Sequence, residues 1–413
     1  MTVKKVILTI TSVIATAAVA AGIFAGANGT KSEAVGETET KAVITVSQTS
    51  EADRIIGKPD YDALKETAEK CGDDVYYIFN EESGELFIFG TGAMDNCTHL
   101  NFAPWAELDV TSVRVADGVT TIGEGAFQYL SNLKSIYIPD SVTMIMYSAF
   151  CDCENLTSIN IPESVTYIGG GAFAGCTSLK GITLPQSLTT INMETFSYCT
   201  NLETVVLPKK LISIEPYAFS SCTSLTSITL PENLRWIREF AFYDCSSLKE
   251  IYIPKNIMGI ETMAFGGLES GIEKITVDKN NLYYSSDSFG VLFDKDKTAV
   301  YQYPVASKNT SYSIPDSVTI ICEYAFAFNK NLSTISIPDS VGYISDFAFA
   351  GLSDVSEISI PDSVYYVGCL AFSHKLTPEK GIDIHVDNTR LYVLKNWNSS
   401  WSDDNTNVSY RFF

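Results

Sequence analysis

The 413-residue chain has only three histidines, and none lies in a motif that would bind a catalytic metal. His99, His374 and His385 stand alone, so no His-Glu-x-x-His pair occurs, and no Gly-x-Ser-x-Gly segment marks a hydrolase nucleophile. A solvated or hydrogen-bonded side chain explains each histidine without any chemistry. Carboxylates are plentiful, but no pair stands out as an acid and a base. The sequence therefore predicts that the protein is not an enzyme.

Motifs for cofactors and metals are missing as well. The segment Gly90–Gly92 lacks the third glycine and the following helix of a dinucleotide-binding loop, so it is predicted to be a turn. Cys151 and Cys153 have no second pair of ligands at zinc spacing. Asp294 and Asp296 do not belong to the alternating oxygen donors of a calcium loop. We expect no cofactor and no metal site.

Basic residues are scarce. The chain has 28 Lys and Arg against 49 Asp and Glu, which gives a formal net charge of −21. The acidic residues are spread along the whole length, so they repel nucleic acids and anionic membranes and keep a long chain soluble. This composition predicts that nucleic acid is not a partner.

Long apolar runs are confined to the first residues. Lys4 and Lys5 precede the apolar run Val6–Ala21, and Ala25–Ala27 has the small residues that a signal peptidase cleaves. The run is short for a membrane span, although a retained anchor remains the alternative. The sequence predicts a signal peptide at 1–27, no membrane insertion after its removal, and a secreted, extracellular protein, with loose association with the cell surface left open.

The next two segments differ sharply in composition. Residues 28–58 are rich in Thr, Ser, Glu, Lys and Ala, which predicts a flexible linker. Within 59–108, Pro59–Lys70 has the pattern of a short helix. Two apolar runs, Tyr76–Phe79 and Leu86–Phe89, flank a segment with Ser83-Gly84 and predict a β-hairpin.

The rest of the chain is dominated by a 23-residue repeat. Three columns of residues keep this phase from the first repeat to the last, with one interruption. They are the phenylalanines 127, 150, 173, 196, 219, 242, 265, 326, 349 and 372, the prolines 139, 162, 185, 208, 231, 254, 315, 338 and 361, and the isoleucines 122, 145, 168, 191, 214, 237, 260, 321 and 344, closed by Val367. Such a register is typical of a solenoid.

One repeat shows how the unit folds. Leu156, Ile159 and Ile161 lie on one face of an extended segment that ends at Pro162, which has no amide hydrogen to donate. A second extended piece, Ser164–Ile168, follows before the chain bends and places a phenylalanine inside. A single unit cannot close a core, but stacked units can, because strands stack at about 4.8 Å and each ring then meets the next.

These residues resemble the repeat of the BspA-like leucine-rich-repeat proteins. The unit Cys176–Pro185, followed by Leu188, Ile191 and Phe196, is similar to that repeat. Three further parts of the chain are similar to features of the family. The N-terminal cap corresponds to Cys71–Asp74, Gly84–Met94 and Ala103–Trp105, and the entry into the repeats to Asp117–Gly123. The hairpin that interrupts many of these arrays corresponds to Asn281–Tyr284 and Phe289–Pro304. The resemblance covers about Cys71 to Val386. The resemblance implies a secreted or surface-exposed protein. Some members of the family act as adhesins, and most have no known ligand.

The expected fold is a mainly β repeat solenoid, a right-handed curved leucine-rich-repeat array with a parallel strand per repeat on its concave face. The N-terminal β-hairpin cap is expected at 59–108, repeats at 109–276 and 315–386, an inserted β-hairpin at 277–314 and a C-terminal cap at 387–413. The C-terminal segment Trp397–Phe413 has no Leu-Pro-x-Thr-Gly sorting motif, which places permanent attachment to the cell in doubt.

Five of the ten cysteines follow the repeat. Cys153, Cys176, Cys199, Cys222 and Cys245 are 23 residues apart, and other repeats have leucine or asparagine in this column. We therefore predict buried, reduced thiols that are slow to alkylate, because free cysteine packs as a small hydrophobic residue. Cys71 and Cys97 lie outside the column, and a disulfide between them is left open.

The candidate binding surface follows from strand alternation, since residues beside a buried strand isoleucine point outward. One outward column consists of Tyr137, Asn160, Thr183, Val206, Thr229 and Tyr252, continued by Ser336 and Ser359. A second consists of Ser135, Ser158, Gly181, Thr204, Ser227, Glu250, Thr334 and Glu357. Small hydroxyl residues also suit a sheet that binds nothing.

The favoured hypothesis is a secreted, non-enzymatic, monomeric binding protein for adhesion or recognition. Its partner would be an extracellular host protein or polysaccharide, bound by the concave sheet through the first column, Tyr137 to Tyr252. The alternative is a passive structural protein of the cell envelope without a specific ligand.

Overall fold

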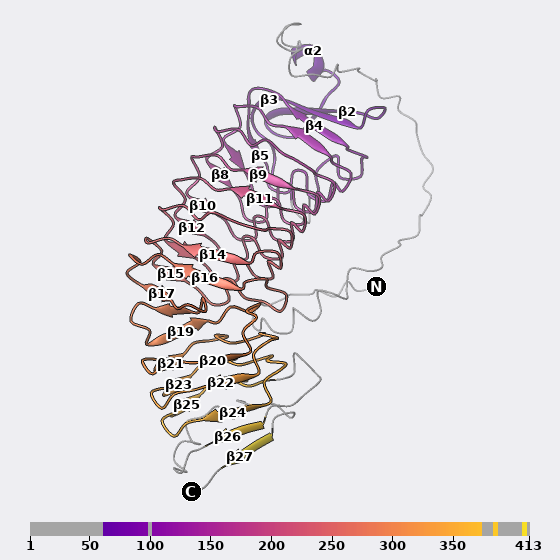
Figure 1. Cartoon of the computed structure of the whole chain (residues 1–413). Helices are drawn as coiled ribbons and strands as arrows, with labels where there is room; N and C mark the ends of the chain where they lie inside the picture. Colours follow the sequence, from indigo (N-terminus) through magenta and orange to yellow (C-terminus); the bar gives the residue numbers. More distant parts are fainter. Residues whose placement is uncertain (1–60, 98–100, 374–382, 387–406, 411–413) are drawn as a thin grey trace. The chain divides into compact units, whose positions relative to one another are not determined.

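The structure is a computed structural model that describes residues 61–97, 101–373, 383–386 and 407–410 (Figure 1). The predicted signal peptide, the predicted linker, His99, His374 and most of the predicted C-terminal cap lie outside these residues. Within the described part, no helix is both long enough and apolar enough to cross a membrane.

The cap begins with the short helix α2 (Tyr61–Lys65) and strand β1 (Glu69–Lys70), followed by β2 (Asp74–Asn80) and β3 (Glu85–Ala93). Strands β2 and β3 form the predicted antiparallel hairpin. The prediction of a helix up to Lys70 was wrong at its end, because Glu69 and Lys70 pair with Tyr77 and Tyr76 of β2. Pairing with the hairpin takes the place of the last helical turn.

Two rows of short strands run through the repeats. The first row contains β4 (Ser112–Val115), β6 (Ser135–Tyr137), β9 (Gly181–Thr183), β11 (Thr204–Val206), β14 (Glu250–Ile253), β16 (Lys274–Val277), β20 (Ser311–Ser313), β22 (Thr334–Ser336), β24 (Glu357–Ile360), β26 (Asp383–Val386) and β27 (Asn407–Tyr410). Neighbouring strands pair in parallel, with equivalent residues of successive repeats opposite each other. The predicted parallel strands are confirmed, although residues 156–161 and 225–230 have no strand in this row.

The second row follows the turn after each proline. It contains β5 (Val119–Ile122), β7 (Met144–Ile145), β8 (Tyr167–Ile168), β10 (Thr190–Ile191), β12 (Ser213–Ile214), β13 (Trp236–Ile237), β15 (Gly259–Ile260), β19 (Ala299–Gln302), β21 (Ile320–Ile321), β23 (Tyr343–Ile344) and β25 (Tyr366–Val367). These strands also pair in parallel. Serine hydroxyls reinforce the turns, as where Ser164 Oγ donates to the carbonyl of Val142 at 2.7 Å.

A ladder of phenylalanines fills the space between the rows. Phe150, Phe173 and Phe196 have no exposed surface, and the centroids of neighbouring rings are 5.3 and 5.5 Å apart with nearly parallel planes. The predicted stack of buried rings is therefore confirmed. At the cap, the ring of Trp105 stacks on Phe127 at 5.8 Å and its Nε1 donates to the carbonyl of Ala126 at 2.8 Å, which closes the first rung.

The insertion contains an antiparallel hairpin of two strands, which joins the second-row strand β19. Strands β17 (Tyr284–Ser286), β18 (Leu292–Asp294) and β19 pair antiparallel, and β19 then pairs in parallel with β21. The Asp294 carboxylate fixes the turn into β19, since it accepts bonds from the amides of Thr298 and Ala299 at 2.6 and 2.9 Å. Strand β20, inside the predicted 277–314, pairs in the first row and so belongs to the repeats.

Candidate binding face

The six candidate binding residues form one continuous outward column, here called the first-row strip. All six side chains are exposed: Tyr137, Asn160, Thr183, Val206, Thr229 and Tyr252. On β6, β9 and β14 they alternate with the buried Ile136, Ile182 and Ile251, as strand geometry requires. The strip presents one side chain per repeat, and none of the six is charged.

A parallel column borders the strip. Ser135, Ser158, Thr204, Ser227 and Glu250 are exposed, and Gly181 is half-buried. Gly181 is small for a local reason, because a Cβ there would lie 2.7 Å from Thr204 Oγ1 of the next repeat. Hydroxyl groups therefore dominate both columns, and the first carboxylate appears only at Glu250.

Arg114 lies at the cap end of the strip, and the sequence analysis missed it. It is in register with Tyr137, one repeat earlier in the same column. Its guanidinium carbon lies 4.2 Å from the ring centroid of Phe87, and its Nε forms an ion pair with Glu85 at 3.3 Å. At this end the strip therefore meets the cap, where the guanidinium group of Arg114 packs on Phe87 and pairs with Glu85. The 23-residue spacing from Tyr137 was the signal in the sequence.

The insertion contacts the other end of the strip. The hydroxyl of Tyr252 donates to Oδ2 of Asp278 at 2.7 Å, and this hydrogen bond raises the pKa of Tyr252. The amide of Asn280 donates to Asp278 at 2.7 Å and is the main reason that the pKa of this carboxyl is lowered. The hydroxyl hydrogen of Tyr252 is thus already engaged, while half of its side chain remains exposed.

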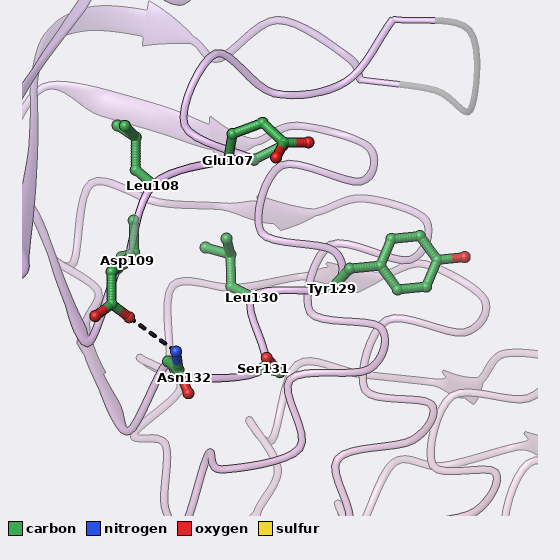
Figure 2. Close-up of a pocket in the computed structure, with 9 residues that line it drawn as sticks. Glu107, Leu108, Asp109, Tyr129, Leu130, Ser131 and Asn132 are labelled. Carbon is green, nitrogen blue, oxygen red and sulfur yellow. Dashed lines mark hydrogen bonds between the residues drawn. The ribbon is translucent and has the colours of Figure 1, made fainter. Parts of the chain in front are cut away.

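A shallow pocket lies where the cap meets the first repeat. It has a volume of about 290 Å³ and is lined by Ala106–Val110 and Tyr129–Asn132. Among the lining residues, Asn132 Nδ2 donates to Asp109 Oδ1 at 2.8 Å, whereas the ring of Tyr129 points away from this pair (Figure 2). The polar pair and the aromatic ring do not converge on one point, so the pocket does not compete with the strip as a binding site.

The column cysteines are buried thiols, as predicted. No described cysteine is in a disulfide, and Cys71 and Cys97 are also buried and unbonded. Each column thiol donates to the phenylalanine carbonyl of the preceding repeat, as from Cys199 Sγ to Phe173 at 3.1 Å and from Cys245 Sγ to Phe219 at 3.2 Å. Burial raises the pKa of Cys199 and that of Cys245 to about 12, so both stay protonated at neutral pH. These thiols serve the core.

The described residues contain no group of three His, Cys, Asp or Glu side chains that could hold a metal ion. The geometry offers an extended surface with one side chain per repeat, which suits binding.

Two stacked rows of strands around a phenylalanine ladder define a leucine-rich-repeat solenoid. The model of the BspA type leucine-rich repeat region matches the chain in six copies, over residues 98–197, 172–291 and 300–390. The chain belongs to this family. Proteins of this family are typically found at surfaces, and this fold typically serves as a non-enzymatic binding scaffold.

Solved structures share the fold. A leucine-rich cell surface protein from Faecalibacterium prausnitzii A2-165 is 23% identical with a TM-score of 0.53, covering 84% of this chain and 95% of that one. A leucine-rich repeat protein from Bacteroides ovatus ATCC 8483 is 24% identical with a TM-score of 0.51, covering 82% and 99%. The pneumococcal vaccine antigen PcpA is 18% identical with a TM-score of 0.50, covering 83% and 98%. No curated protein matches the sequence.

Proposed function

We propose that this protein is a secreted, non-enzymatic binding protein that recognises an extracellular host protein or glycan through the first-row strip. The supporting observation is the unbroken column of exposed, uncharged side chains from Tyr137 to Tyr252. Such a column is repeated once per rung, and repeat proteins commonly bind ligands along rows of this kind.

Charge favours a polar, neutral contact surface. The whole chain has a net charge of −21, whereas the strip has no charged side chain. Docking on the strip therefore requires little desolvation of charge, and the negative net charge of the chain disfavours anionic ligands. Length supports the same conclusion, since five steps of about 4.8 Å separate Tyr137 from Tyr252, or about 24 Å in total.

The two tyrosines are the strongest anchors on the strip. Tyr137 is 51% exposed and Tyr252 is 50% exposed, so each ring can gain substantial contact area when a ligand covers it. Tyrosine offers a large, stiff surface with a polar tip, and it is enriched among residues that dominate binding energy. The contact of Tyr252 with Asp278 holds this ring before any ligand arrives.

The test is a paired substitution. The mature chain is used to capture ligands from host extracellular matrix and from a glycan array, and the affinity is then measured with Tyr137→Ala and Tyr252→Ala combined. We expect a loss of at least about tenfold, since each exposed anchor contributes on the order of 1 kcal/mol or more. Tyr129→Ala is the matched control, because this ring is 59% exposed but lies off the strip. An unchanged affinity in the double variant would place the site elsewhere, and the absence of any captured ligand would favour a passive envelope protein.

A further inference from the structure

The second strand row carries an aromatic surface near the end of the described repeats. Tyr301, Ile320, Tyr343, Tyr365 and Tyr366 lie outward on or beside four consecutive strands, β19, β21, β23 and β25, which stack in the orange part of Figure 1. Tyr365 is 58% exposed, Ile320 40% and Tyr301 37%, while Tyr343 and Tyr366 are half-buried. These five residues are here called the second-row tyrosine patch.

Gly342 leaves room for the ring of Tyr365, the most exposed ring of the patch. A Cβ added to Gly342 would lie 2.5 Å from Cε1 and 3.0 Å from Cδ1 of Tyr365, so the ring rests directly on the backbone of the preceding repeat. The amide of Tyr365 donates to the carbonyl of Gly342 at 2.9 Å, which fixes the two segments together. The equivalent residues in the two repeats before Gly342 are Thr298 and Thr319, whose Cβ atoms would occupy this space.

The neighbouring rings are held just as firmly. Tyr343 and Tyr366 face each other across β23 and β25, with ring centroids 4.3 Å apart and planes inclined by 8°. Because these rings stack on each other, their contacting faces are closed to a ligand, which leaves their edges and their hydroxyl groups, and the two hydroxyl groups are within hydrogen-bonding reach of each other. The patch is organised before any ligand binds, which lowers the entropic cost of binding.

The chemistry of the patch favours a sugar. None of its five side chains is charged, and the net charge of −21 opposes anionic ligands. An aromatic face carries negative partial charge, so it attracts the C–H groups on the flat face of a pyranose ring, and tyrosine hydroxyls can bond to the sugar's hydroxyls. Flat C–H faces occur in β-linked sugars whose hydroxyl groups are equatorial.

The size of the patch disfavours a folded protein as the partner. Its exposed surface is on the order of 400 Å², given 150–250 Å² for a whole aromatic side chain. A stable protein interface needs about 800 Å² from each partner. A short stretch of a polysaccharide chain fits the smaller area.

We propose that the second-row tyrosine patch binds a neutral, β-linked polysaccharide whose sugar rings pack on Tyr365 and bond to the edges of Tyr343 and Tyr366. This inference does not depend on the first-row strip, which lies in the other strand row.

The experiment is affinity electrophoresis of the mature chain in native gels that contain soluble mixed-linkage β-glucan. We expect the glucan to retard migration, and carboxymethylcellulose, a β-glucan with carboxylates, to retard it much less. Tyr365→Ala should weaken the retardation at least about tenfold, and Gly342→Ala should weaken it as well, because the added Cβ displaces the ring. Tyr365→Phe should retain most of the binding, since stacking requires the ring rather than its hydroxyl.

The controls separate this site from the first-row strip. Tyr137→Ala combined with Tyr252→Ala should leave retardation by β-glucan unchanged, and circular dichroism melting should confirm that every variant is folded. The proposal would be overturned by no retardation of the unmodified chain by β-glucan, or by equal retardation of the unmodified chain and of folded Tyr365→Ala. Loss of binding in the first-row double variant alone would also overturn it, because the glucan would then bind to the strip.

Discussion

In each described repeat from Phe127 to Phe349, two residues have a left-handed backbone, one on either side of the buried phenylalanine. Gly171 (φ 62°) and Gly175 (φ 71°) flank Phe173, and in the next repeat Glu194 (φ 57°) and Tyr198 (φ 59°) flank Phe196. Left-handed geometry costs about 1–2 kcal/mol for a residue with a Cβ. Some repeats avoid this cost with glycine, whereas others accept it.

Equivalent substitutions at equivalent positions should therefore differ in effect. Gly171→Ala should lower the free energy of unfolding by about 1 kcal/mol. The added Cβ would meet only Ser148 Oγ, at 3.3 Å, so the cost comes from the backbone. Glu194→Ala, one repeat later, replaces one residue that has a Cβ with another and should change stability by less than about 0.5 kcal/mol. Urea unfolding of both variants checks this, and equal losses would contradict it.

The column thiols make stability depend on pH in the alkaline range. The pKa of Cys199 and that of Cys245 are raised from about 9 to about 12 by burial. Between these values the unfolded chain loses protons that the folded chain keeps, so stability is full below pH 9 and falls as the pH rises toward 12. Folding also lets each thiol donate to a phenylalanine carbonyl, which a thiolate cannot do.

We therefore expect the urea midpoint to fall steadily above pH 9. Replacing both Cys199 and Cys245 with alanine should lower the urea midpoint at pH 7, because each substitution leaves a small cavity and removes one hydrogen bond. It should also make the decrease of the midpoint above pH 9 shallower. The midpoint is measured between pH 7 and 10.5. An equally steep fall in the double variant would assign the effect to other groups.

Among whole elements, the phenylalanine ladder determines how the repeats stack. Phe173 lies between Phe150 and Phe196 and is fully buried. Phe173→Ala should cost about 3–5 kcal/mol, because it removes a ring and leaves a cavity between two rungs. Phe173→Leu should cost less, since most of the volume remains. A loss below about 1 kcal/mol in the alanine variant, measured by urea unfolding, would show that the neighbouring rings close the gap.

The strands, the ladder and the exposed strip were predictable because each depends on a local pattern repeated in phase. A residue that recurs every 23 positions meets its own equivalents in the next rung, so burial of Phe173 and exposure of Thr183 follow from one repeat. Buried cysteines followed in the same way, because leucine occupies their column elsewhere.

Features that depend on contacts outside this phase could not be predicted. Glu69 and Lys70 leave the predicted helix because β2 offers them a partner. Tyr303 is different, because it lies 23 residues before Phe326, stacks on that ring at 5.4 Å and so keeps the phase of the ladder; this rung was missed because its ring belongs to a tyrosine in a column of phenylalanines. The tyrosine patch was missed because it arises from departures from the repeat, and its main signal is Gly342, which follows Thr298 and Thr319 in its column.

At the scale of the molecule, the dependence of binding on salt distinguishes a ligand held by the acidic surface from one held by the uncharged strip. An acidic chain attracts any cationic partner over a long range, and such contacts weaken as salt rises. The first-row strip carries no charge, so binding there depends on rings and hydroxyl groups. These contacts are little affected by ionic strength. Salt dependence therefore tells which surface a captured ligand uses.

We expect the affinity of a ligand bound on the first-row strip to change by less than about threefold between 50 and 500 mM NaCl, because screening acts on exposed charges and the strip has none. The measurement is a titration of the captured ligand at both salt concentrations, with the unmodified chain and with the Tyr137→Ala and Tyr252→Ala double variant. The double variant tests the strip, whereas salt tests the acidic surface. A ligand that loses affinity steeply with salt and ignores the double substitution binds to the carboxylates. A ligand that ignores salt and loses affinity with the two rings binds where the solenoid repeats its polar, uncharged side chains.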